Sequence, residues 1–295
     1  MKKTMIYLCA IIVVFSLPTV MRGLTAEEVI ENMLTAYEKQ MYNIEDVKIT
    51  TGFDIKHMKR TVIDGEIVYM IRTEIGVGPV DKIITIWDGE YQWFAGPDGK
   101  VEKQKEKFDR GEVVHQLLNT EAEYVGKADL DGYETHILNV KGLDMQEADK
   151  NYGRMDGEVW IDANDWVPRK LELIIPVEDS EDEDKHDSLT VLMEDYRNYE
   201  GMLVPLITKM ITYPNITPDK QQEMREKLDE MEREFEQMPQ EQRELFDSGG
   251  MWETHINMMR EALETGEYIM AIEVLDVQVN TGLSDDMFDG ELLGK

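Results

Sequence analysis

The side chains that most often carry chemistry in proteins are present in this sequence, but their spacing forms no catalytic or metal-binding motif. No two histidines show the H-x-x-x-H or H-E-x-x-H spacing that places zinc ligands on one helix face; the histidines are His57, His115, His136, His186 and His255. There is no G-x-S-x-G nucleophile motif and no glycine-rich phosphate loop. We therefore expect a protein that is not an enzyme and that needs no metal or cofactor.

Carboxylates are too frequent here to indicate acid–base catalysis, because 62 Asp and Glu face 31 Lys and Arg. The densest acidic run, residues 178–187, lacks the alternating ligands, central glycine and closing glutamate of an EF-hand loop. It predicts a flexible, solvated loop. The formal net charge of −31 argues against nucleic acid and anionic lipid surfaces as partners, and is compatible with a basic partner or with simple solubility.

The N-terminus predicts export. Lys2 and Lys3 precede an apolar run over residues 5–17, which is short for a membrane span, and polar sequence begins after residue 23. We interpret residues 1–23 as a cleavable signal peptide; an uncleaved anchor is the alternative. The single cysteine, Cys9, lies within that run, so a mature chain of residues 24–295 would contain no disulfide.

The rest of the chain alternates apolar and polar residues with the period of β-strands. The clearest example is residues 157–176, GEVWIDANDWVPRKLELIIP, in which two alternating segments flank a polar corner. We expect further strands at residues 47–55, 61–75 (interrupted at Asp64-Gly65), 83–87, 91–95, 134–140, 189–196, 203–213 and 269–279, and helices at 25–40 and 106–119. The sequence thus predicts one large, curved antiparallel sheet in a single α+β, mainly β domain.

Residues 217–265 break this pattern and predict a helical insertion before the last strand. Apolar residues recur there at four-three-four-three spacing, at Met224, Leu228, Met231, Phe235 and Met238, and a second helix follows at 251–263. Because methionine adapts to partners of different shape, the stripe predicts a lid or a partner-binding surface. Ordinary packing of the insertion against the sheet is the other interpretation.

Several motifs, in this order, resemble the LolA-like family of periplasmic lipoprotein carriers, in particular its branch of outer-membrane lipoprotein-sorting proteins. They are LTAEE at 24–28, WDG at 87–89 with Tyr91 and Trp93, WID at 160–162 with VPRKL at 167–171, YEG at 199–201 with Val204-Pro205, and VQVNTGL at 277–283 with Phe288. The resemblance covers residues 24–216 and 266–290. It implies an incomplete, half-open β-barrel with a helical lid over an apolar cavity.

The resemblance also implies a function without chemistry, namely sheltering the acyl chains of a lipoprotein or lipid for transfer across the periplasm to the outer membrane. An inner-membrane donor and an outer-membrane acceptor would be the partners. The family's carriers use an arginine inside the barrel, and Arg72 is placed similarly, although Ile71-Arg72-Thr73 replaces their Arg-Pro pair. The predicted acyl-binding residues are Met33, Ile49, Phe53, Ile71, Arg72, Ile84, Ile86, Val159, Ile161, Leu173 and Leu206.

An alternative function uses the same fold as a sensor or adaptor that binds an envelope membrane protein without lipid transport, because a fold does not determine a function. Its binding surface would be the acidic face or the helical insertion. A third possibility is a barrel filled by its own side chains.

Overall fold

The computed structural model describes residues 23–63, 66–76, 82–96, 98–105, 113–144, 154–176, 186–213, 218–240, 243 and 251–293. In this part of the chain, thirteen strands form one antiparallel sheet in the order β6-β5-β4-β3-β2-β1-β13-β12-β11-β10-β9-β8-β7. Strands β6 and β7 are its two edges, so the sheet does not close into a barrel. This confirms the predicted large, open antiparallel sheet.

The strands form two leaves. The first leaf contains β1 (Asp46–Thr51), β2 (Asp54–Ile63), β3 (Glu66–Gly76), β4 (Lys82–Trp87), β5 (Gln92–Ala95) and β6 (Val101–Gln104). The second contains β7 (Glu121–Leu130), β8 (Tyr133–Asp144), β9 (Arg154–Asp162), β10 (Pro168–Pro176), β11 (His186–Tyr199) and β12 (Met202–Tyr213). The helices are α1 (Ala26–Met41), α2 (Val113–Leu117), α3 (Pro218–Gln237) and α5 (Met251–Thr265), with 3₁₀ turns η1 (Asp285–Phe288) and η2 (Gly290–Leu292).

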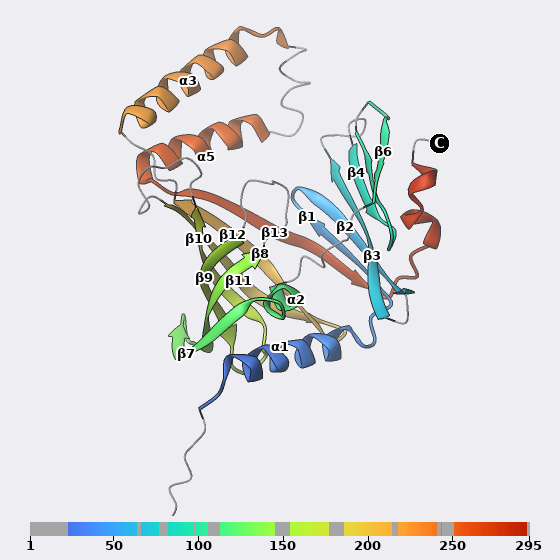
Figure 1. Cartoon of the computed structure of the whole chain (residues 1–295). Helices are drawn as coiled ribbons and strands as arrows, with labels where there is room; N and C mark the ends of the chain where they lie inside the picture. Colours follow the sequence, from blue (N-terminus) through green and yellow to red (C-terminus); the bar gives the residue numbers. More distant parts are fainter. Residues whose placement is uncertain are drawn as a thin grey trace, which may run out of the picture.

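Strand β13 (Tyr268–Val279) connects the two leaves (Figure 1). Its first half pairs with β12, from Tyr268 opposite Thr212 to Glu273 opposite Ile207. Its second half pairs with β1, where the register shifts between Thr50 and Thr51. The two leaves therefore meet along a single strand.

Helix α1 begins with the capping box that the sequence predicts. The Thr25 hydroxyl accepts the backbone N–H of Glu28 at 3.2 Å, and the Glu28 carboxylate accepts the backbone N–H of Thr25 at 2.8 Å. The apolar side of the helix, with Val29, Ile30 and Met33, packs on the second leaf and forms the main core with β8, β9 and β10. We call the face of the sheet that carries α1 the inner face.

The C-terminal tail, residues 281–293, packs against the opposite, outer face of the first leaf. Phe288 is 1% exposed and forms a second core with Ile86 and Trp93. Gly290 lies so close to the Trp93 ring that a Cβ atom would be about 2.1 Å from it. The first leaf therefore carries this core on its outer face, in addition to the small core around Val47 on its inner face.

Helices α3 and α5 form a hairpin that projects from the ends of β12 and β13 (Figure 1). The predicted insertion between the last two strands is thus present as two antiparallel helices. None of the described helices is both long enough and apolar enough to span a bilayer.

Several elements differ from those predicted. The expected strand at 47–55 is divided, because the Thr51 hydroxyl accepts the backbone N–H groups of Phe53 and Asp54 and turns the chain there. Strands β6 and β7 were not predicted. Of the helix expected at 106–119, the described residues contain α2; residues 106–112, residues 1–22 of the predicted signal peptide and residues 178–185 of the predicted acidic loop lie outside them. The last two residues of that predicted loop, His186 and Asp187, begin β11.

Candidate functional site

The middle of the inner face carries apolar side chains that are only partly buried. The strand register places Met210 on β12 opposite Met270 on β13, and Thr208 opposite Ile272. Across the junction, Ile49 on β1 lies opposite Val277. These side chains are half-buried, because α1 covers β8 to β10 more fully than it covers β12, β13 and β1.

Four of the predicted acyl-binding residues lie under α1 in the main core. Val159 and Ile161 are 0% exposed, Leu173 is 1% exposed, and Met33 of α1 itself is 2% exposed. The structure brings them together on the inner face, as predicted, but in this conformation they contact one another and other core residues. A ligand could reach them only if α1 moved away from the sheet.

Three further predicted residues share the inner face and are partly exposed. Ile71 lies opposite Met58 on β2, and Ile49 packs with Met58 against the small core around Val47. Leu206 lies on the inner face of β12, two residues before Thr208, which is opposite Met193 of β11. These three extend the apolar surface from the second leaf to the first.

The remaining predicted residues lie elsewhere. Arg72 pairs with Ile86 on the outer face, where Ile86 and Ile84 pack against the C-terminal tail. The Arg72 guanidinium bonds Glu74 at 2.7 Å and donates to the carbonyl oxygen of Met287 at 3.0 Å. Phe53 lies in the β1–β2 turn and is 46% exposed. Seven of the eleven candidates thus lie at the inner face. Arg72, which the resemblance placed inside the barrel, lies on the outer face.

Sequence reasoning missed a set of methionines on the inner face. Met58, Met193 and Met210 lie on β2, β11 and β12, and Met270 lies on β13; all four are partly buried. The alternation along residues 268–279, in which every second residue is more buried up to Val274, is the signal that identifies Met270 and Ile272.

Strand alternation also decides the orientation of Trp160. Val159 and Ile161 are in the main core, so Trp160 lies on the outer face, where the Lys170 ammonium is 4.8 Å from its ring centroid. Trp160 therefore does not line the inner face.

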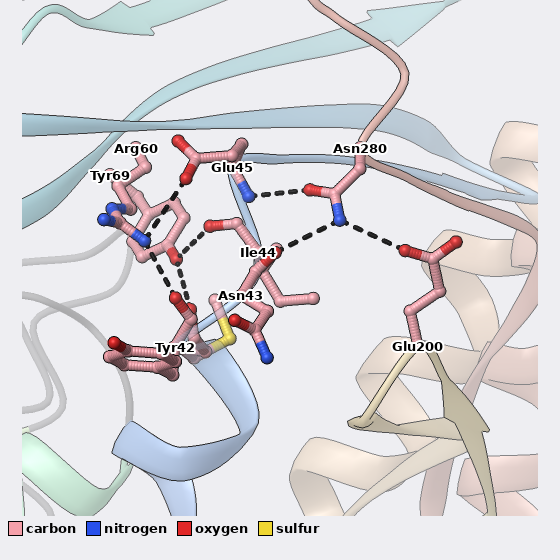
Figure 2. A network of polar contacts seen from close by, with 9 residues as sticks. Tyr42, Asn43, Ile44, Glu45, Arg60, Tyr69, Glu200 and Asn280 are labelled. Carbon is pink, nitrogen blue, oxygen red and sulfur yellow. Dashed lines mark hydrogen bonds and ion pairs between the residues drawn. The ribbon is translucent and has the colours of Figure 1, made fainter.

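The C-terminal end of α1 is held by a polar network (Figure 2). The Asn280 side chain accepts the backbone N–H of Glu45 at 2.7 Å and donates to the Asn43 carbonyl and to Glu200, each at 3.1 Å. The Tyr69 hydroxyl donates to the carbonyl oxygens of Met41 and Ile44. These bonds tie the end of α1 to β3, to the β11–β12 turn and to the end of β13.

The carboxylate of Asp46, a residue that is 3% exposed, extends this polar network to the C-terminal tail. It accepts the backbone N–H groups of Thr281 and Gly282 at 2.8 Å and of Leu283 at 3.2 Å. Burial alone would raise the pKa of Asp46, but these hydrogen bonds and that of the Thr281 hydroxyl outweigh it, so its pKa is below the ordinary value. The start of β1 and the start of the tail are therefore joined by a buried charge.

By contrast, the N-terminal half of α1 is held mainly by apolar contacts, with Val29, Ile30 and Met33 in the main core. Tyr37, further along, meets the ring of His115 on α2 edge-on at 5.5 Å. The helix is thus bonded by polar groups at one end and packed by apolar groups along its length.

A buried histidine lies at the margin of the inner face. His136 on β8 is 3% exposed, stacks on Trp166 at 5.0 Å between centroids, and has Nδ1 3.1 Å from the Tyr124 hydroxyl. Burial, and then the positive charge of Lys127, lower its pKa. Within the described residues, no group of three or more His, Cys, Asp or Glu could hold a metal ion.

No protein-family model matches the sequence, and no curated protein matches it. Among solved structures, it is similar to a DUF1329 family protein from Desulfovibrio piger (TM-score 0.49, 12% identity, covering 91% of this chain and 98% of the other). It is also similar to a putative outer membrane lipoprotein-sorting protein domain from Vibrio parahaemolyticus (TM-score 0.47, 11% identity, covering 90% of this chain and 100% of the other). A third similar structure is a LolA superfamily protein from Nitrosomonas europaea (TM-score 0.40, 11% identity, covering 90% of this chain and 98% of the other). One of these solved structures is thus a LolA superfamily protein, which carries the name of the family that the sequence motifs resemble.

Proposed function

We propose that this protein shelters acyl chains of a lipoprotein or lipid against the inner face of its sheet. The observation that carries the proposal is the half-buried apolar surface formed by Ile49, Ile71, Leu206, Met210 and Met270. Methionine and isoleucine side chains at such a surface can adapt to a flexible hydrocarbon chain. Burying the chain would contribute about 0.8 kcal/mol per methylene group.

Helix α1 would act as the cover of this surface. When α1 is in place, Val159, Ile161 and Leu173 belong to the core; when it rotates about its anchored C-terminal end, they would extend the acyl-binding surface. A long acyl chain would replace the contacts that α1 gives up. Binding would therefore be coupled to displacement of the helix.

The exported N-terminus predicted by the sequence would place this exchange in the periplasm. A donor at the inner membrane would deliver the cargo and an acceptor at the outer membrane would receive it. No bond is made or broken in this scheme, so it requires neither a catalytic residue nor a cofactor.

The first experiment is native mass spectrometry of the mature protein purified from its own periplasm, with lipid extraction of the same sample. We expect a co-purifying lipid or acylated peptide at stoichiometric amount. A clean apo mass, with no uptake of an added fluorescent fatty-acyl probe, would contradict the proposal.

The second experiment locates the binding surface with variants on the paired strands β12 and β13. Met270 lies on the inner face of β13 and its neighbour Ile269, 38% exposed, on the outer face. We expect Met210→Gln/Met270→Gln to weaken binding of the fatty-acyl probe at least tenfold, and Ile269→Gln to leave it unchanged. Equal affinity of both variants would show that the inner face is not the site.

The adaptor hypothesis makes the opposite prediction for the same measurements. A protein that binds no acyl probe and carries no lipid, but forms a complex with an envelope membrane protein, would use this fold for protein recognition alone.

A further inference from the structure

The α3–α5 hairpin has a small hydrophobic core of its own. Leu228, Ile256 and Leu263 are 3–4% exposed and pack with Trp252 and Met259; all the described members of this cluster belong to the two helices. Phe235 stacks on Trp252 with ring centroids 5.0 Å apart. The hairpin is therefore stabilised internally, and it projects from the sheet (Figure 1).

This core covers only part of the apolar stripe of α3. Leu228 is 4% exposed, whereas Met224 and Met231, on the same stripe, are each 38% exposed. Residues at this four-three-four spacing normally face a partner helix along their whole length. Helix α5 covers one side of the stripe, and the methionine side remains partly exposed.

The charge of the hairpin limits what that third helix can be. Helix α3 contains eight acidic and four basic residues. Three of the four basic residues already bond within the hairpin: Arg225 donates to the Leu263 carbonyl, Lys227 pairs with Glu223, and Arg233 donates to the Asp229 carbonyl. Because Glu230 and Glu234 are exposed, a second copy of this acidic helix would be repelled and a basic one attracted.

We propose that the methionine side of the α3–α5 hairpin docks a basic amphipathic helix of another protein. The apolar side of that helix would pack on Met224 and Met231, and its lysines or arginines would lie near the exposed glutamates of α3. Methionine suits this role because it adapts to partner side chains of different shapes. The proposal does not depend on acyl-chain binding, since the hairpin and the inner face are separate surfaces.

The test uses the full mature protein and a fluorescein-labelled helical peptide with leucine at the a and d positions of three heptads and lysine elsewhere. The comparison peptide has glutamate in place of lysine. The test variant is Met224→Ser/Met231→Ser, and the matched control is Gln222→Ser/Gln237→Ser, at two exposed residues of the same helix. Fluorescence anisotropy gives the dissociation constant, and circular dichroism checks that each variant retains its helix content.

We expect the lysine peptide to bind the wild type and the control with constants within twofold of each other. The methionine variant should bind at least tenfold more weakly, and the glutamate peptide at least tenfold more weakly than the lysine peptide. Equal affinity of the methionine variant would overturn the proposal, because the attraction would then be charge alone. A wild-type dimer in sedimentation that the methionine variant abolishes would overturn it in favour of an interface between two copies.

Discussion

The Nη1 atom of Arg72 donates to the carbonyl oxygen of Met287 at 3.0 Å, on the face of the sheet opposite to α1. The guanidinium also bonds Glu74, which is in turn 3.2 Å from Lys82. Arg72 therefore connects β3 to the C-terminal tail. Its position on the outer face differs from that of the arginine inside the barrel that the resemblance implied.

Replacing Arg72 with leucine should loosen the tail without affecting acyl binding. Loss of the guanidinium leaves Glu74, with a side chain 14% exposed, bonded to Lys82 alone, which should cost about 1–3 kcal/mol of unfolding free energy. We expect faster hydrogen exchange in residues 283–293 and an unchanged constant for the fatty-acyl probe. A large loss of probe affinity, with hydrogen exchange in the tail unchanged, would indicate that Arg72 belongs to the acyl-binding site.

Asp46 should make the free energy of unfolding depend on pH in the acidic range. Because its pKa is lowered in the folded chain, the unfolded chain binds the proton first as pH falls. The stabilisation is present above the ordinary aspartate pKa of about 4 and is lost as pH falls through the lower, folded value. Asp46→Asn should lose about 1–3 kcal/mol at neutral pH, since four hydrogen bonds reach this carboxylate.

Urea unfolding of Asp46→Asn between pH 7 and pH 3 measures this effect, with Asp276→Asn, exposed on β13, as the control. The Asp46 variant should show a smaller decrease below pH 4 than the wild type. Parallel curves for the two proteins would indicate that the carboxylate does not anchor the tail.

His136 should add a second pH dependence, at higher pH. Its pKa is lowered from 6.5 by burial and by Lys127, so the folded chain resists protonation that the unfolded chain accepts. The corresponding stability is present above pH of about 6.5 and is lost as pH falls through the folded pKa. His136→Phe, which keeps a ring against Trp166, should reduce the difference in unfolding free energy between pH 7 and pH 5.

Leu228→Ala tests whether the hairpin is an independent unit. The side chain is 4% exposed in a cluster of few residues, and its truncation should cost about 2–5 kcal/mol. We expect α3 and α5 to exchange their amide hydrogens quickly while β8 to β11 stay protected. Met224→Ala, on the half-exposed side of the stripe, should change the exchange far less. Uniform loss of protection across the sheet would mean that hairpin and sheet unfold together.

The sequence allowed the sheet to be predicted because most strands have one buried and one exposed side. Residues 268–279 and 157–176 alternate clearly, and α1 carries its capping box. Strand β6 lacked this signal, since VEKQ contains one apolar residue. Strand β7, EAEYVGKADL, does alternate, but most of its more buried positions are small residues, Ala122, Gly126 and Ala128. Edge strands can be polar because one of their neighbours is water.

The inner-face residues were predictable only in part. Alternation shows that Ile71 and Arg72 point to opposite faces, but not which face α1 or the tail covers. That depends on contacts between residues far apart in the sequence, such as Ile86 with Phe288. For the same reason the sequence identified Met33 and Ile161 as apolar sites without showing that they bury one another.

Strand β13 is preceded by the helical hairpin and followed by the C-terminal tail, and it pairs with a different leaf along each half. A force applied to the hairpin would therefore act along β12 and β13. It would load in shear the hydrogen bonds between β12 and β11 and those between β13 and β1. The same strand would carry this force past Met270 to the bulge at Thr50–Thr51 and to the Asp46 anchor. The hairpin, Met270 and the hydrogen-bonded end of α1 thus lie in series along one mechanical path through β13.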